Sequence, residues 1–242
     1  MNKNTKCSAE FKNYPFLEAD EFAEACHQLD RRYTQATLGP IRRRWKLRVC
    51  RALDTSFSAS ADYATYIQII RPLDGELDDA DLSACLDNFS FGHDSGDAVD
   101  TEDHEMMEAE NSDFAVVSKV QKPPDFGLVT YEIHLHPTYQ APCLWFSLDR
   151  LPVDEPAFNI DTVFRRLVPD QYKDSLRRVG NIGGISADHH PVTGVPSFFV
   201  HPCLLGDAMS NFDCSKEDYL MVWLGLVGGC VGLWVPKEMA MV

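Results

Sequence analysis

Four short strand-like segments, three of which alternate apolar with polar residues, constrain the fold of this 242-residue chain more than any other feature. They cover residues 45–49, 63–70, 129–136 and 143–148. Because successive side chains of a strand point to opposite faces, alternation predicts strands that bury one face only. The first two segments are near enough to pair as a hairpin, and a turn at 137–142 joins the last two. We therefore expect a four-stranded antiparallel meander.

Helical periodicity flanks these strands. Large apolar residues recur at the spacing of one helix face in residues 18–33, which predicts an N-terminal helix. The same spacing predicts two short helices at 160–167 and 172–179, which glycines end. The three arginines at 42–44 are expected to be a solvated entry to the first strand. The expected fold class is α+β, with a single domain spanning residues 1–242.

The most apolar part of the chain is Tyr219–Val235. It has 17 residues and four glycines, whereas a membrane-spanning helix needs about 20 apolar residues. We therefore predict a buried core helix followed by an extended segment, and no integral membrane segment. The first twenty residues lack the apolar stretch of a secretory signal peptide, so a cytoplasmic location is expected.

The formal charge of −15 comes from one segment of the chain. Asp74–Asp113 contains fifteen Asp and Glu and neither Lys nor Arg, which leaves 22 acids against 22 bases elsewhere. So few large apolar residues cannot offset the entropy of ordering, which predicts a disordered acidic insertion over residues 74–122. This acidity would repel phosphate, so a nucleic-acid partner is not expected.

One of eight cysteines occupies a distinctive position. Ser197–Val200 reads as a buried strand after a proline- and glycine-punctuated loop at 188–196, and Pro202 ends regular pairing because it has no N–H. Cys203 is therefore expected at an edge, where a thiol can meet a second macromolecule. His201, two residues earlier, could support the thiolate or serve as a structural histidine. The cysteines form no C-x-x-C pair, so neither a disulfide framework nor a zinc ribbon is indicated.

Three other chemistries were weighed for this thiol. A papain-like protease needs a histidine after its cysteine, and none follows Cys203; a permuted order using His134, His136, His189 or His190 stays open. A zinc deaminase needs a second cysteine where Gly206 stands. A zinc site would have to combine adjacent histidines, His189 and His190, with His201 and Cys203, and adjacent histidines rarely face one metal. Thioester transfer needs an exposed thiol and docking surfaces, without a cofactor.

Four motifs in the second half of the chain occur in a distinctive order. Through them, residues 129–236 resemble the autophagy E2-like conjugating enzymes, above all the branch that conjugates the ubiquitin-like autophagy-related protein twelve to autophagy-related protein five. A sister branch, which conjugates a lipid-linked ubiquitin-like protein, also carries His-Pro-Cys. The motifs are Tyr139–Phe146, His190–Pro196, Phe198–Cys203, and Tyr219–Leu224 with Val231–Pro236.

The resemblance implies an E2-like fold and a transferase that acts in autophagy. Cys203 would receive a ubiquitin-like protein from an E1-like activating enzyme and deliver it to a lysine of an acceptor protein bound directly, without a dedicated E3. Ordinary ubiquitin E2s carry His-Pro-Asn before their cysteine, but here Val192 follows His190-Pro191. His190 could replace that asparagine or could lock its own loop, and Asn181 or a backbone N–H could also serve. An E2-like binding module without chemistry is the alternative function.

Overall fold

The computed structural model describes residues 10–53, 63–73, 127–179 and 184–242 of the chain. The insertion expected at residues 74–122 lies outside these ranges, as does Asn181. All of the predicted strands and helices lie within the described residues, whereas Gly180 and Gly183, expected to end the second short helix, do not.

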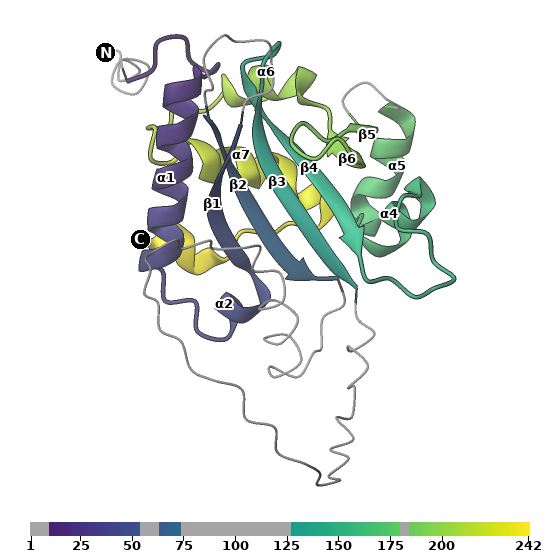
Figure 1. The fold of residues 1–242 in the computed structure, drawn as a ribbon. Coiled ribbons are helices and arrows are strands. Elements are labelled where there is room, and N and C mark those ends of the chain that lie inside the picture. The colour runs from purple at the N-terminus through teal and green to yellow at the C-terminus, as the bar shows by residue number, and fades with distance from the viewer. Residues whose placement is uncertain (1–9, 54–62, 74–126, 180–183) are drawn as a thin grey trace, which may run out of the picture.

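The centre of the fold is a six-stranded antiparallel sheet in the order β1-β2-β3-β4-β6-β5 (Figure 1). The four predicted strands are present as a meander, which confirms that part of the interpretation. Each pairs with the next over most of its length, as in the run from Tyr131 opposite Phe146 to His136 opposite Ala141. The strands are β1 (Lys46–Leu53), β2 (Tyr63–Pro72), β3 (Leu128–His136), β4 (Ala141–Asp149), β5 (Ile185–His189) and β6 (Pro196–Val200).

The expectation of a four-stranded sheet was wrong by two strands. The predicted strand at Ser197–Val200 is part of β6, which joins the same sheet beside β4. Residues 188 and 189, expected in a loop, belong to β5, which pairs with β6 at the edge of the sheet. Most β5 side chains face solvent, so only Ile185 contributes a large buried apolar group. An edge strand of this kind has too little apolar alternation to be recognised from sequence.

The predicted N-terminal helix is confirmed as α1 (Ala19–Gln35), and the two short helices are α4 (Ile160–Arg166) and α5 (Asp170–Val179). The arginine run was misjudged, because it forms one helical turn, α2 (Ile41–Arg44), rather than a strand entry. The Arg42 guanidinium lies 4.7 Å from the Tyr33 ring centre and donates to three carbonyls at the end of α1. These bonds satisfy carbonyls that the helix itself leaves without donors.

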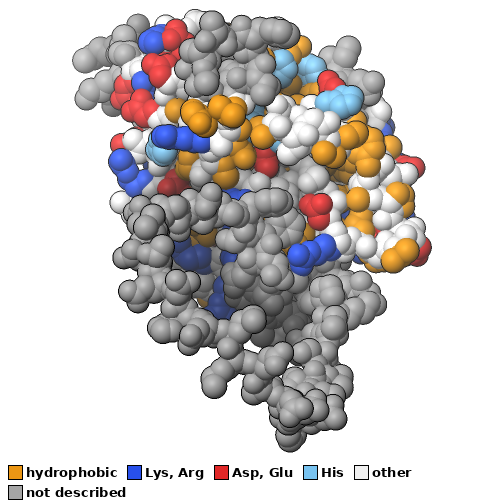
Figure 2. Space-filling view, in the orientation of Figure 1, with side chains coloured by type: hydrophobic (Ala, Val, Ile, Leu, Met, Phe, Trp, Pro, Cys, Tyr) orange, Lys and Arg blue, Asp and Glu red, His pale blue; other side chains and the backbone are white. Residues whose placement is uncertain are grey.

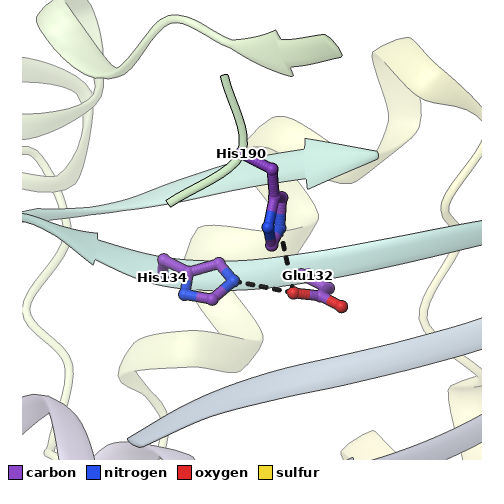
Figure 3. A group of neighbouring side chains, drawn as sticks. All are labelled: Glu132, His134 and His190. Atoms are coloured by element: carbon purple, nitrogen blue, oxygen red, sulfur yellow. Dashed lines mark hydrogen bonds and ion pairs between the residues drawn. The ribbon is translucent and has the colours of Figure 1, made fainter. Parts of the chain in front are cut away.

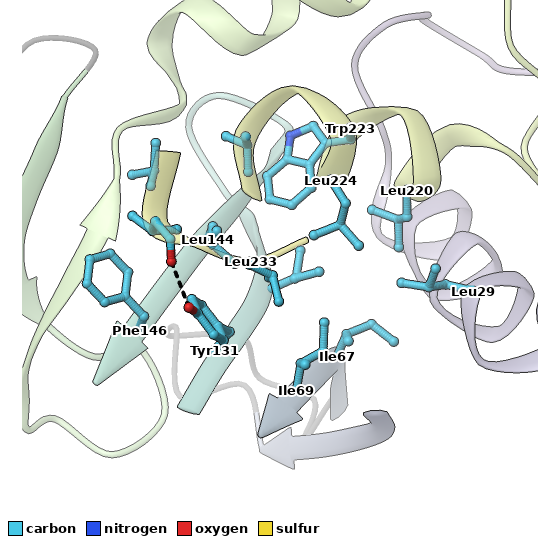
Figure 4. Packing of buried hydrophobic residues seen from close by; sticks show 14 of the residues in the cluster. Leu29, Ile67, Ile69, Tyr131, Leu144, Phe146, Leu220, Trp223, Leu224 and Leu233 are labelled. Carbon is cyan, nitrogen blue, oxygen red and sulfur yellow. Dashed lines mark hydrogen bonds between the residues drawn. The ribbon is translucent and has the colours of Figure 1, made fainter. Parts of the chain in front are cut away.

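The apolar C-terminal stretch forms the buried helix α7 (Tyr219–Val227), a 3-10 turn η2 (Gly228–Val231) and then an extended segment, as predicted. Helix α7 packs with α1 against one face of the sheet, and Figure 4 shows Trp223 and Leu224 over Ile67. The Tyr131 hydroxyl donates to the Val231 carbonyl at 2.7 Å, which fixes the chain beyond α7 to the sheet. No helix within the described ranges has the length and apolar character that crossing a membrane requires.

Close packing explains one glycine in this C-terminal segment. A Cβ atom at Gly228 would lie 2.3 Å from the Leu233 carbonyl oxygen, so only glycine allows the turn to approach so closely. Residues of the sheet that alternate with this core point to the opposite face, which α1 and α7 leave uncovered. We call it the open face, and it carries the polar residues of β3.

Candidate functional site

Cys203 lies in a short turn directly beyond strand β6. The strand ends at Val200, and residues 202–204 form the 3-10 turn η1, which contacts β4 and leads into helix α6 (Leu205–Met209). The Cys203 residue is partly exposed, and its neighbour Leu204 is 56% exposed. Pro202 occupies the first position of the turn, where a missing N–H costs nothing. The sequence prediction of an edge position for the cysteine therefore matches its surroundings.

The His201 side chain holds this turn together. Its Nδ1 atom accepts a hydrogen bond from the Cys203 backbone N–H at 3.2 Å, and the backbone N–H of His201 donates to the Gly184 carbonyl at 3.0 Å. Such a side-chain acceptor at the start of a turn satisfies an otherwise unpaired N–H. Because Nδ1 acts as an acceptor, the neutral ring carries its proton on Nε2. His201 is thus bonded to the main chain of the cysteine and leaves the thiol group available.

Two residues that the sequence analysis named, Tyr139 of the Tyr139–Phe146 motif and His136, form a second group beside this turn. The Tyr139 ring lies edge-on to the His201 ring with 5.5 Å between centres, and it lies 4.8 Å from the His136 ring. His136 ends β3, and Tyr139 lies in the turn between β3 and β4. The His136 ring accepts from the backbone N–H groups of Thr138 and Tyr139 in this turn. Burial, and next the charge of His201, hold the pKa of His136 below its ordinary value. The sequence predicted a turn at 137–142, but it could not show that Tyr139 contacts His201.

These groups lie at the surface. Figure 2 shows histidine and hydrophobic side chains next to one another near the end of the molecule where Figure 1 places α6. The Tyr139 residue is 37% exposed. The turn that carries Cys203 is therefore bordered by the His201 and Tyr139 rings, and Cys203 itself is partly exposed.

His190 lies on the open face beside Glu132, apart from Cys203. Its backbone closes the β5–β6 loop by accepting from the Gly194 N–H and donating to the Val195 carbonyl, both at 2.9 Å. Its Nδ1 atom accepts from the backbone N–H groups of Val192 and Thr193 at 3.3 Å. Its Nε2 atom lies 3.0 Å from Glu132 Oε2 (Figure 3). Both ring nitrogens are therefore occupied within the protein.

Glu132 is the centre of a polar network that crosses three strands, β1 to β3, and this loop. Arg48 donates to Gln68 at 2.8 Å, and Gln68 donates to Glu132 Oε1 at 2.7 Å. His134 Nε2 lies 2.8 Å from Glu132 Oε2, and its ring stacks on Tyr66 with 4.5 Å between centres. Sequence alternation placed these residues on one face, but it could not show that they are bonded to one another.

The network controls the ionisation of its members. Burial by itself would raise the pKa of Glu132, but hydrogen bonds from His134, His190 and Gln68 hold it well below its ordinary value. Burial lowers the pKa of His134, against the opposing effect of Glu132. The Glu132 carboxylate is thus held in its charged form, and burial favours the neutral form of His134. The charged Glu132 carboxylate is therefore stabilised by hydrogen-bond donors on both of its oxygens rather than by water.

The same three side chains have the elements of a metal site. Glu132, His134 and His190 each place a ligand atom within 4.8 Å of the others, and a His₂Glu set is known for zinc. However, a histidine that binds a metal through Nε2 carries its proton on Nδ1 and donates it to an acceptor. Here the Nδ1 atom of His190 faces two N–H donors instead. The donor set therefore fits a hydrogen-bonded cluster better than a metal centre.

The structure thus brings together two of the three predicted site residues. His201 is bonded to Cys203, whereas no hydrogen bond or ring contact within the described ranges joins His190 to either of them. The rings of Trp145 and Phe199 form the intervening contacts, at 5.5 Å from His190 to Trp145, 4.7 Å between the two, and 6.0 Å on to His201. His189 is exposed and lies apart from the cluster.

Other cysteines have environments suited to inert thiols. Cys26 and Cys143 are fully buried, and burial raises the pKa of each thiol. Burial likewise raises the pKa of Cys230 to about 11. A thiol that stays protonated is a poor nucleophile. These cysteines therefore offer no rival to Cys203 as a reactive group.

Comparison with known proteins places the chain. Residues 21–238 match the family model described as "Autophagocytosis associated protein, active-site domain". The chain is 63% identical to the "Ubiquitin-like-conjugating enzyme ATG10" of Gibberella zeae over 231 residues, which is 95% of this chain and 98% of that protein. It is 29% identical to the human protein of the same name over 121 residues, covering 47% of this chain and 53% of that protein.

Proposed function

Since the chain belongs to the autophagocytosis-associated family and is an E2-like ubiquitin-like-conjugating enzyme, we propose that Cys203 is the residue that carries the ubiquitin-like protein. Within the family, the chain belongs to the branch resembled by its motifs, not to the lipid-conjugating sister branch. One observation carries the proposal. Cys203 is a partly exposed thiol in a capped turn at the end of a strand, with its backbone N–H bonded to His201.

Two exchanges at one sulfur describe the reaction. The Cys203 thiolate attacks the thioester carbonyl carbon of the ubiquitin-like protein on the E1-like enzyme; the new C–S bond forms and the enzyme's cysteine leaves as a thiolate. The amine of an acceptor lysine then attacks the same carbon, a C–N bond forms, Cys203 leaves as a thiolate, and the amine gives its proton to water. The product is an isopeptide bond, and no oxidant or cofactor is required.

His201 and His190 have supporting roles in this proposal. His201 orients the turn by accepting the Cys203 N–H, which sets the direction of the Cys203 backbone. His190 serves as the lock of the β5–β6 loop, because its two ring nitrogens already bond to Val192, Thr193 and Glu132. Of the two roles that the sequence left open for His190, these contacts favour loop locking over oxyanion stabilisation.

The activity requires an E1-like enzyme and a ubiquitin-like protein as partners. We further propose that the acceptor protein binds this chain directly and that transfer takes place in the cytoplasm. We also propose that residues 1–242 form one domain, because the described helices and strands share one sheet and one hydrophobic core. The acidic segment 74–122 would then be an insertion between neighbouring strands of that domain.

The test uses the full chain with an E1-like enzyme, ATP and the ubiquitin-like protein. Wild-type protein should form an adduct that a thiol reductant cleaves, and Cys203→Ser should form a more stable oxyester. Cys50→Ser, which changes another partly exposed thiol on the open face, serves as the control and should still form the reducible adduct. An adduct that survives Cys203→Ala would overturn the assignment of Cys203. No adduct with any form would also overturn it and would favour the binding-module alternative.

A further inference from the structure

The N-terminal segment Phe11–Leu17 is fixed to the scaffold before helix α1 begins. The buried Glu21 carboxylate accepts the backbone N–H of Lys12 at 2.8 Å and of Glu18 at 3.0 Å. From the other side, the Tyr219 hydroxyl of α7 donates to the Pro15 carbonyl at 2.6 Å. The segment is thereby attached to both helices that cover the core. It forms a rigid extension of that layer.

This extension touches both loops that border Cys203. The Leu17 N–H donates to the Gln140 carbonyl at 2.7 Å, and Gln140 follows Tyr139 in the β3–β4 turn. On the other side the Phe16 ring packs on Gly206 in α6, so closely that a Cβ atom at Gly206 would lie 2.9 Å from Phe16 Cε1. Figure 1 shows the N-terminal segment and α6 at the same end of the sheet.

Tyr14 adds a hydrogen bond to the far end of α6. Its hydroxyl oxygen lies 2.8 Å from the Met209 carbonyl oxygen and 2.5 Å from that of Phe212. Met209 is the last residue of α6, and its carbonyl also accepts the Phe212 N–H at 2.9 Å, so the Tyr14 hydroxyl lies against the turn that ends this helix. The turn that carries Cys203 is therefore continuous with a helix whose start and end both meet the N-terminal segment.

We propose that Tyr14 and Phe16 are positioning residues for thioester transfer. They hold α6 against the scaffold, while the adjacent Leu17 N–H ties the β3–β4 turn to the same segment, and these contacts together set the direction of the Cys203 thiol relative to Tyr139 and His201. Neither residue needs to touch the ubiquitin-like protein. Attack on a thioester depends steeply on geometry, so a shift of about 1 Å in the turn is enough to slow transfer up to a hundredfold. The inference rests on the proposed role of Cys203.

Gly206 permits a test by compensation. The Gly206 backbone has an ordinary conformation, so alanine fits the helix itself but its Cβ meets the Phe16 ring. Gly206→Ala should slow single-turnover transfer from the charged E1-like enzyme about tenfold. Phe16→Leu should slow it less, and the double variant should recover most of the loss, because the smaller side chain yields space. Additive losses in the double variant would contradict the proposed contact.

Tyr14→Phe removes the hydroxyl and keeps the ring. We expect the maximal rate of transfer to fall about fivefold with an unchanged half-saturating concentration of charged E1-like enzyme, since one hydrogen bond to a loop is lost. Tyr172→Phe, which removes a hydroxyl next to Gly229 and away from this turn, is the matched control and should leave both quantities unchanged. A rise in the half-saturating concentration with an unchanged maximal rate would mean that Tyr14 belongs to a docking surface, against the proposal.

A second readout does not depend on conjugation. Iodoacetamide alkylates exposed thiolates, so its rate at Cys203, followed on the Cys203 peptide by mass spectrometry across pH, reports the setting of the thiol directly. Tyr14→Phe and Gly206→Ala should change this pH profile, while the thermal midpoint of unfolding changes little. An unchanged profile would overturn the positioning role even if Cys203 is the carrier. Altered alkylation without any adduct would separate failure of the Cys203 assignment from failure of this one.

Discussion

The cluster around Glu132 and the turn at Cys203 use similar residues in opposite ways. Around Glu132 every ring nitrogen of His190 is bonded, the carboxylate has donors on both oxygens, and the group is buried. Around Cys203 one histidine bonds only to the main chain, and the adjoining side chains are half-exposed. A buried network is stable only when complete, whereas a thiol that must accept a large acyl group needs an unoccupied approach. The contrast shows that the presence of histidines does not by itself mark the reactive site in this fold. What marks it is whether the ring nitrogens still have hydrogen-bonding capacity.

Replacing Cys203 and Cys143 in turn by alanine should give the largest contrast. Cys203→Ala should abolish adduct formation, because no sulfur remains to form the thioester. Cys143→Ala removes a buried thiol whose Sγ lies 3.6 Å from the Val200 carbonyl, so it should lower stability slightly and keep the adduct. Gel analysis of the reducible adduct measures both. Loss of the adduct in Cys143→Ala, in a folded protein, would remove the distinction between the two positions.

Replacement of Glu132 should have the next largest effect, and on stability. Glu132→Leu leaves the Nε2–H groups of His134 and His190 without an acceptor, which should cost about 3 kcal/mol in the free energy of unfolding. Glu132→Gln keeps an oxygen for the two rings and should cost less. Urea unfolding measures both, with Glu24→Gln on the exposed side of α1 as the control. A cost for Glu132→Leu as small as that of the control would mean that the network contributes nothing.

Replacement of His201 should affect rate more than stability. His201→Ala removes the acceptor for the Cys203 N–H, a loss of about 1 kcal/mol for a capping group, or about fivefold in the rate of transfer. His201→Asn keeps an acceptor that favours such positions and should restore most of the rate. His189→Ala, in an exposed side chain of β5, is the control. If asparagine fails to rescue while alanine is slow, the ring acts on the reaction by a route other than the cap.

The smallest expected effect is a dependence of stability on pH. Burial holds the pKa of His134 below its ordinary value of 6.5, so the unfolded chain binds protons more readily than the folded one. The contribution of the neutral His134 ring to the free energy of unfolding is therefore fully present above about pH 6.5 and is lost as the pH falls below it. The slope is at most about 1.4 kcal/mol per pH unit for each such histidine. His134→Gln should flatten the curve of unfolding free energy between pH 6.5 and 5, apart from the share of His136. An unchanged curve would contradict this assignment.

Much of the fold followed from local patterns in the sequence. Alternation identified β1 to β3, an apolar run after a turn identified β4, apolar spacing identified α1, and the short apolar stretch with its glycines identified α7 as a core helix. These features depend on neighbours within one element, which a sequence displays directly. Strand β5 escaped because its side chains are exposed and it is held by backbone pairing with β6.

The site was predictable only in part, for a related reason. The position of Cys203 depends on the strand and proline just before it, so it could be inferred. The bond between His190 and Glu132 joins residues 58 positions apart and depends on the loop from β5 to β6. No periodicity encodes such a contact. The choice between loop locking and oxyanion stabilisation therefore required the hydrogen-bond partners of the ring.

The last pair of the β2–β3 ladder has a consequence for how this chain can vary. Pro72 lies opposite Leu128, and the Leu73 N–H donates to the Gly127 carbonyl at 2.8 Å, so the ladder is closed at the end of β3 remote from His136 and Cys203. The chain therefore leaves the sheet at Leu73 and returns to it at Gly127, where a single backbone hydrogen bond joins the two residues. Lengthening a connection adds only a slowly growing entropy of closure, about 0.6 kcal/mol for each doubling. Lineages can therefore expand, shrink or rewrite residues 74–126 while the register of the sheet, and the chemistry at its other end, is inherited unchanged.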